Sequence, residues 1–109
     1  QLLEDRAIDA VFAVNELFAV TIIKTANKMG LKVPQDLAVI AFTDGIISKY
    51  STPSITTVSQ SGNKMGNKAA KMLIDRLESE TEEEEEGEEE ENYKTEVIET
   101  HLIERESTD

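Results

Sequence analysis

Short apolar runs alternate with amphipathic stretches in the first half of the chain. Ala7–Val14 (AIDAVFAV) is almost wholly apolar, which predicts a strand buried on both faces. Leu17–Met29 has the spacing of a helix, and Asn15 before it can accept a backbone hydrogen bond as the N-cap. Gly30 supplies a left-handed stop, and Leu37–Phe42 (LAVIAF) is a second apolar strand. This order predicts a βαβ unit with a parallel, right-handed crossover.

The second half of the chain predicts more elements of the same class. After a loose segment, Ser54–Gln60 (SITTVSQ) is a third strand, Gly62–Leu77 a second helix, and Thr95–Ser107 one or two final strands. The apolar stripe of the second helix consists of Met65, Ala69, Met72 and Leu73. We therefore expect an α/β fold, a parallel sheet with flanking helices.

The first helix has an apolar side and a polar side. At 100° per residue, the side expected to face the sheet carries Phe18, Ile22, Ala26 and Met29. Leu17 and Val20 lie nearer the polar side, which Lys24 marks. They are either scattered exposed apolar residues, which are common, or a contact face for a partner subunit.

Charge is concentrated in one segment. The chain has 23 acidic and 11 basic residues, and eleven of the acids fall within Glu78–Glu91. The other 95 residues carry 12 acids and 11 bases, so they offer no basic field for nucleic acid. The glutamate run repels itself and lacks the ligand alternation of a calcium loop, so we expect a disordered, solvated linker. No apolar run approaches the roughly 20 residues of a membrane span.

Polar residues follow three of the predicted strands. In an open parallel sheet, ligands bind beyond the carboxyl ends of the strands. The residues delivered there are Asn15, Thr43, Asp44 and Gln60. Amide, hydroxyl and carboxylate groups can bond several hydroxyls of a sugar or similar polyol at once. The alternative is that Asn15 is only a helix cap, Asp44 part of a turn, and Gln60 a residue ahead of a helix.

Catalytic, metal and cofactor sites are not predicted. The single histidine, His101, has no companion nucleophile motif, and no glycine-rich phosphate loop follows a strand. The chain has no cysteine, which excludes disulfides and thiolate metal sites and fits a reducing compartment. It begins with Gln1 rather than methionine, so we expect natural sequence to precede it.

Several motifs occur together in one order: DAVFAVNELFAVTIIKTANKMGLKVPQDLAVIAFTD, KYSTPSITTVSQ, KMGNKAAKMLIDRL and LIERES. They resemble the C-terminal part of LacI/GalR-type transcriptional regulators over nearly the whole chain except the glutamate run. The resemblance implies a periplasmic-binding-protein-like effector domain, with two α/β lobes and a small effector between them. A separate helix-turn-helix, absent from this chain, would read the operator DNA.

The resemblance also implies a division of the chain. Residues from about 5 to 49 would belong to the C-terminal lobe, and about 54–78 to a strand and helix of the N-terminal lobe. Residues 79–92 would be an acidic flexible linker, and 95–107 the final strands.

Site residues follow from the same resemblance. Asn15 matches the asparagine that reaches the effector, and Gln60 matches a glutamine near the cleft. Thr43 occupies the place of the usual effector-contacting aspartate, with Asp44 beside it. The positions of subunit contacts carry Leu17, Val20 and Tyr50.

We therefore expect the effector-binding and dimerisation part of a sugar-responsive, cytoplasmic regulator that binds DNA only through the missing domain. It would be a homodimer or higher oligomer without a membrane partner. The alternative is a periplasmic sugar-binding protein of a transporter, which shares the fold. An enzyme is not expected.

Overall fold

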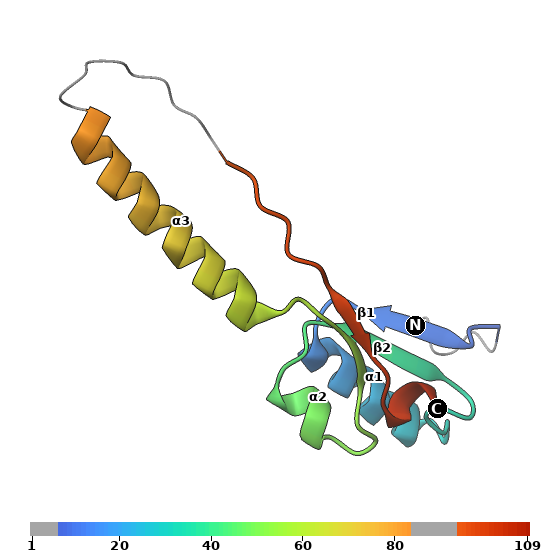
Figure 1. Ribbon diagram of the computed structural model, residues 1–109. Helices are drawn as coiled ribbons and strands as arrows, with labels where there is room; N and C mark the ends of the chain where they lie inside the picture. The colour runs from blue at the N-terminus through green and yellow to red at the C-terminus, as the bar shows by residue number, and fades with distance from the viewer. Residues whose placement is uncertain (1–6, 84–93) are drawn as a thin grey trace. The chain divides into compact units, whose positions relative to one another are not determined.

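The computed structural model describes residues 7–83 and 94–109 (Figure 1). The chain divides into two compact units. The first, which we call the sheet unit, comprises residues up to Gln60 together with Thr100–Asp109. The second, which we call the helix unit, is Ser61–Glu99.

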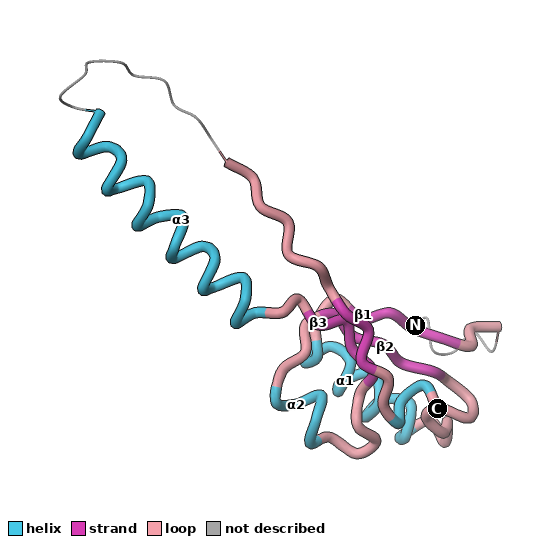
Figure 2. Tube along the Cα trace, in the orientation of Figure 1, coloured by secondary structure: helices cyan, strands magenta, loops and turns pink. Residues whose placement is uncertain are grey.

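The sheet unit contains a four-stranded sheet. Its strands are β1 (Ala10–Ala13), β2 (Ala38–Phe42), β3 (Thr56–Ser59) and β4 (His101–Ile103), side by side in that order (Figure 2). The first three are parallel and β4 is antiparallel to β3. The predicted α/β class and the parallel β1–α1–β2 pairing are thus confirmed, with shorter strands than predicted.

Helix α1 (Glu16–Lys28) begins and ends one residue before the predicted Leu17–Met29 and has the predicted cap. The Asn15 side chain accepts a hydrogen bond from the backbone N–H of Phe18 at 2.9 Å, so Asn15 is the N-cap. At the other end, Gly30 has a φ of 77°, the left-handed conformation that stops a helix.

The buried face of α1 differs from the prediction. The helix buries Ala19, Ile23 and Ala26 against the sheet, whereas Phe18 and Met29 are exposed. The buried stripe is therefore rotated by less than one residue position, because Ala26 belongs to both the predicted and the buried face. The alanines explain the rotation, because small side chains let the helix backbone approach β1 and β2 closely, which the bulky Phe18 would prevent.

The core lies on one face of the sheet. Ala13, Val39, Ala41 and Ile55 are buried with the α1 residues, and alternate residues of each strand point the other way. On that other face Phe12 is exposed, with its ring 6.4 Å from the ring of Phe42. The prediction that the first strand is buried on both faces is thus wrong within the described chain, because α1 covers only one.

Helix α2 (Ile46–Tyr50) lies in the segment predicted to be loose. It is a single turn, and its N-cap, Gly45, has no side chain to offer. The carboxylate of Glu16 takes that place by accepting bonds from the backbone N–H groups of Gly45 and Ser48. A cap supplied from another helix leaves no local sequence signal, which explains why α2 was missed.

Helix α3 (Gly62–Glu83) dominates the helix unit and ends six residues later than predicted. Glutamate is a good helix former, and the Ser79 hydroxyl donates to the Asp75 carbonyl at 2.8 Å. The predicted linker 79–92 is therefore helical as far as Glu83, and its remainder lies outside the described residues. The predicted stripe is mostly uncovered, with Met65 and Leu73 exposed. In the described part of the chain, no helix is long and apolar enough to span a bilayer.

The strand and the helix of the predicted segment 54–78 lie in different compact units of this chain. The strand joins the sheet unit, and the helix forms the other unit after Gln60. β3 pairs with β2 in parallel. Ladder hydrogen bonds hold the strand to its parallel neighbour.

The C-terminal segment crosses the sheet unit. Of the predicted region 95–107, only β4 is a strand, and a 3₁₀ helix η2 (Glu106–Thr108) follows it. Buried Ser107 donates from its backbone to the Ser54 carbonyl, and its hydroxyl accepts from the Thr56 N–H, both at 2.8 Å. These bonds satisfy backbone groups next to β3 and fix the end of the chain against the sheet.

Candidate functional site

The carboxyl ends of β1, β2 and β3 form one edge of the sheet. Ala13, Ala41 and Thr57 lie in one row across these strands. Asn15 and Thr43 each follow the row residue of their strand by two positions, and Gln60 follows by three. The structure thus brings the predicted effector residues to one edge, because parallel strands end on the same side.

Asn15 and Gln60 occupy opposite ends of this edge in the strand order. Both are half-buried. The cap on α1 uses the Oδ1 atom of Asn15, and an amide also carries two N–H donors. Capping and ligand binding are therefore compatible roles for Asn15. Gln60 ends the first segment of the sheet unit, directly before Ser61.

Thr43 has an unusual backbone at the centre of the edge. Its φ is 74°, in the left-handed region, and its side chain is exposed. For a β-branched residue this conformation is a genuine outlier that costs about 1–3 kcal/mol. The Thr43 N–H donates to the Val58 carbonyl at 3.1 Å, so one backbone hydrogen bond ties the residue to β3.

Asp44 is held from within the sheet unit. Its Oδ1 atom accepts from the Thr57 hydroxyl at 2.9 Å and lies 2.8 Å from the Arg105 Nη2 atom. The other terminal nitrogen of Arg105, Nη1, donates to the Ile55 carbonyl at 2.8 Å and to the Thr57 hydroxyl at 3.1 Å. Arg105 and Asp44 are 15% and 23% exposed. The site residue predicted beside Thr43 therefore belongs to an internal cluster of Asp44, Thr57 and Arg105.

Sequence reasoning missed Arg105 and Glu16. Arg105 stood in the quoted LIERES motif without an assigned role. Glu16 follows Asn15 and contacts the other side of the loop, where its Oε2 atom accepts from the Gly45 N–H at 3.1 Å. Only the three-dimensional structure brings these charged side chains to the loop, because they come from distant parts of the chain.

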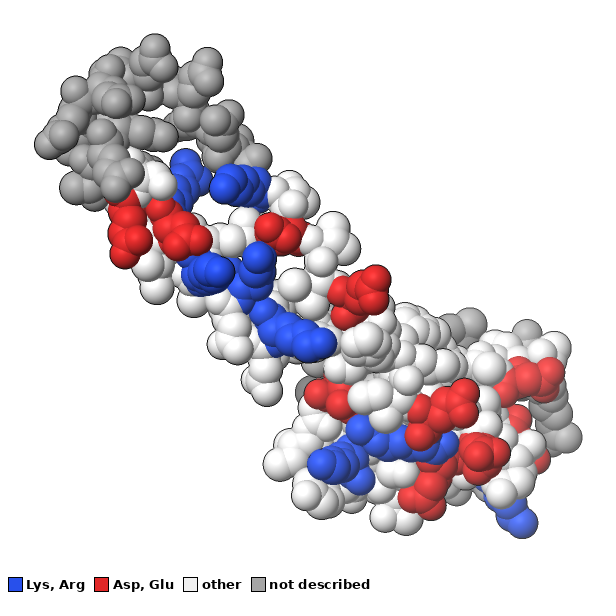
Figure 3. Space-filling view, viewed as in Figure 1, with Lys and Arg blue, Asp and Glu red and all other residues white. Residues whose placement is uncertain are grey.

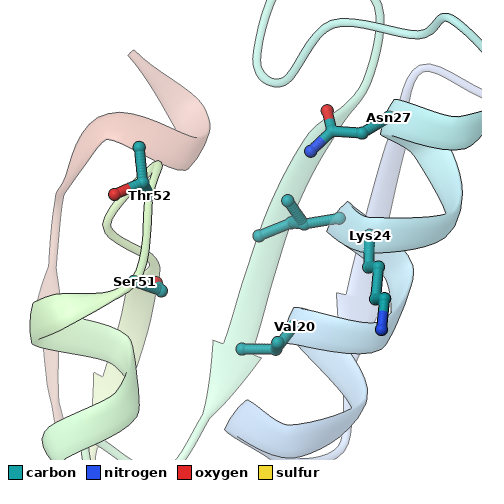
Figure 4. Close-up of a pocket in the computed structure, with 6 residues that line it drawn as sticks. Val20, Lys24, Asn27, Ser51 and Thr52 are labelled. Carbon is teal, nitrogen blue, oxygen red and sulfur yellow. The ribbon is translucent and has the colours of Figure 1, made fainter.

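A shallow pocket of about 200 Å³ lies elsewhere, between α1 and the segment after α2 (Figure 4). Its lining residues are Val20, Ile23, Lys24, Asn27, Ser51 and Thr52. None of the predicted effector residues lines this pocket. Val20 and Asn27 point from α1 toward Ser51 and Thr52 in the close-up.

The predicted subunit-contact residues have different environments. Tyr50 is 75% and Leu17 60% exposed, whereas Val20 is half-buried and packs against the core. Ile46, at the other end of α2, is 73% exposed. Helices α1 and α2 contact each other, and both carry exposed apolar side chains.

Charges are mixed on the surface of the sheet unit. On the face in Figure 3, acidic and basic side chains lie close together on this unit. Such an arrangement gives no single-signed field on that face to attract phosphate groups.

Comparison with known proteins identifies the family. A family model described as "Periplasmic binding protein-like domain" matches residues 1–108. The HTH-type transcriptional regulator CelR of Thermobifida fusca is 36% identical over 105 residues, which cover 94% of this chain and 28% of that protein. Many further curated relatives match, so the similarity is not confined to one protein.

Solved structures have the same fold. A transcriptional regulator CelR–cellobiose complex matches with a TM-score of 0.71 and 32% identity, over 91% of this chain and 28% of that one. A LacI family transcriptional regulator from Enterococcus faecium with bound ribose matches with a TM-score of 0.82 and 25% identity, over 98% and 37%. The chain thus spans only 28–37% of the length of the chains that it matches here.

These matches confirm the resemblance to LacI/GalR-type regulators and the predicted fold class. The chain belongs to the periplasmic-binding-protein-like domain family, and its relatives are LacI-family transcriptional regulators.

Proposed function

We propose that the chain is the effector-binding and dimerisation part of a LacI-type transcriptional regulator. A small molecule bound at the carboxyl edge of the sheet would control operator binding by a separate helix-turn-helix. The observation that carries the proposal is the common edge of Asn15, Thr43 and Gln60, in a chain whose relatives are transcriptional regulators. The complete protein would act in the cytoplasm, where its DNA lies.

The effector we propose is a sugar. The edge offers two amides and a hydroxyl, which can donate and accept hydrogen bonds with several ligand hydroxyls at once. The neighbouring structures with bound cellobiose and ribose support this class of ligand. Thr43 offers one hydroxyl where the family has a carboxylate, so the sugar would be held there by fewer bonds.

A homodimer is part of the proposal. Leu17, Ile46 and Tyr50 are exposed on the contacting helices α1 and α2. Exposed apolar patches of this kind favour association. Among the described strands, β1 lies at the edge of the sheet, and an edge strand offers backbone groups with which another chain can pair.

The alternative, a transporter's periplasmic sugar-binding protein, finds no support among the reported relatives, which are regulators. The discriminating experiment uses the complete natural protein and DNA from upstream of its own gene. We expect a gel shift that a panel of monosaccharides and disaccharides, including ribose and cellobiose, strengthens or weakens. Sugar binding without any sequence-preferring DNA shift would support the transporter component instead.

A further inference from the structure

Three consecutive residues at the centre of the sheet edge are held by three different parts of the sheet unit. The Thr43 N–H bonds the Val58 carbonyl in β3. The Asp44 carboxylate bonds Thr57 and forms an ion pair with Arg105, which follows β4. The Gly45 N–H bonds Glu16 in α1. We call residues 43–45 the clamped loop.

The clamped loop contains a backbone conformation that its own sequence does not favour. A threonine rarely adopts a φ of 74°, because its branched side chain meets the backbone. Such a conformation persists only where the surrounding structure over-determines it. The bonds made by Thr43, Asp44 and Gly45 supply that constraint, and the strongest is the charged one at Asp44.

The position of Arg105 makes it the centre of this constraint. Its side chain is largely buried, and its two terminal nitrogens reach Asp44, Thr57 and the Ile55 carbonyl. A planar guanidinium holds such partners in fixed directions, which a lysine ammonium cannot do. Because Ile55 is fully buried, the Asp44 carboxylate is tied through Arg105 to the core.

We propose that Arg105 is a positioning residue: through Asp44 it imposes the left-handed backbone of Thr43 and so fixes the Thr43 hydroxyl at the sheet edge. Asp44 acts through this contact and not as a ligand of the effector. The hydroxyl's role toward a ligand rests on the proposed function, whereas the mechanical link from Arg105 to Thr43 does not.

The link is tested without a ligand, in the complete natural protein, by a thermodynamic cycle. Asparagine tolerates the left-handed region, so Thr43→Asn relieves the unfavourable backbone and should raise the melting temperature by about 2–4 °C. If Arg105 imposes that backbone, the loop relaxes in the Arg105→Lys protein. In that protein Thr43→Asn should raise the melting temperature by less than half as much as it does in the wild type. The same comparison is made in an Asp44→Asn protein, whose side chain can still accept a hydrogen bond from Thr57.

Ser61 provides the matched control. Apart from Thr43, it is the only non-glycine residue of the described chain with a positive φ, which is 52°. It lies outside the sheet unit. Ser61→Asn should change the melting temperature equally in the wild-type, Arg105→Lys and Asp44→Asn proteins, because independent sites are additive.

Hydrogen exchange gives a local readout of the same variants. Peptides covering residues 41–48 should exchange at least about tenfold faster in Arg105→Lys, while peptides of β1 exchange as in the wild type. This pattern separates a positioning role from general destabilisation, which would accelerate both regions. Equal gains from Thr43→Asn in all backgrounds, or unchanged exchange at residues 41–48, would overturn the proposal.

Discussion

Ser48 donates two hydrogen bonds to a single oxygen of Glu16. Its backbone N–H lies 3.0 Å and its hydroxyl 2.8 Å from the Oε2 atom. This contact joins the first residue of α1 to the middle of α2, and Ser48 is fully buried there. A helix of one turn is not stable alone, so α2 depends on this carboxylate.

Removal of the carboxylate should therefore destabilise the protein. Glu16→Ala leaves the Ser48 and Gly45 donors without this acceptor, and we expect a loss of about 1–3 kcal/mol in the free energy of unfolding. Glu16→Gln keeps an acceptor oxygen and should lose less. Denaturant unfolding measures both, with Glu104→Ala, at an exposed residue, as the control. A Glu16→Ala protein as stable as the control would contradict the capping role.

Gly45 should be sensitive to substitution for the same reason. A Cβ atom at this position would overlap the Oε1 atom of Glu16, so the carboxylate would have to move away. Gly45→Ala should thus break the same bonds as Glu16→Ala. We expect the double variant to be no less stable than Gly45→Ala alone, as measured by a double-mutant cycle. Fully additive losses would mean that Gly45 and Glu16 act independently.

Local sequence patterns predicted much of the fold. The Asn15 cap, the Gly30 stop and the parallel β1–β2 pair depend on neighbouring residues, and all are present. What failed depends on packing between distant segments. The rotation of α1 follows from how closely Ala19 and Ala26 approach the sheet, and α2 needs Glu16 from another helix.

The candidate site was predictable in part. Strand order alone places Asn15, Thr43 and Gln60 at one edge, because the ends of parallel strands meet there. The partners of Asp44 were not predictable, since the contact with Arg105 requires the path of the C-terminal segment across β3. The charge and spacing of the residues near Asp44 do not predict that path.

The two roles of Asn15 can be separated by substitution. Asn15→Asp keeps an oxygen that accepts from the Phe18 N–H but loses the amide donors. We expect it to keep the melting temperature within a few degrees and to weaken the sugar response of the complete protein. Asn15→Ala should lose stability as well, by about 1 kcal/mol. An Asn15→Asp protein with an unchanged sugar response would leave Asn15 as a helix cap only.

The subunit-contact residues should differ in effect. Tyr50 is exposed, so Tyr50→Ser should weaken self-association without lowering the stability of the subunit. Val20 packs against the core, so Val20→Ser should lower stability instead. Analytical ultracentrifugation over a range of concentrations, paired with thermal unfolding, separates these effects. A Tyr50→Ser protein that associates as strongly as the wild type would place the contact surface elsewhere.

Calorimetric titration tests most directly whether the effector binds at the carboxyl edge of the sheet. The complete protein is titrated with the sugar that most alters its DNA binding. We expect Gln60→Ala and Asn15→Asp to bind that sugar about 10- to 100-fold more weakly than the wild type. The control is Asp9→Ala. Asp9 is exposed and directly precedes β1, at the end of the strand away from the carboxyl edge, so this variant should bind the sugar normally. Wild-type affinity in both edge variants would contradict the account, because the sugar would then be bound away from the carboxyl ends of the strands.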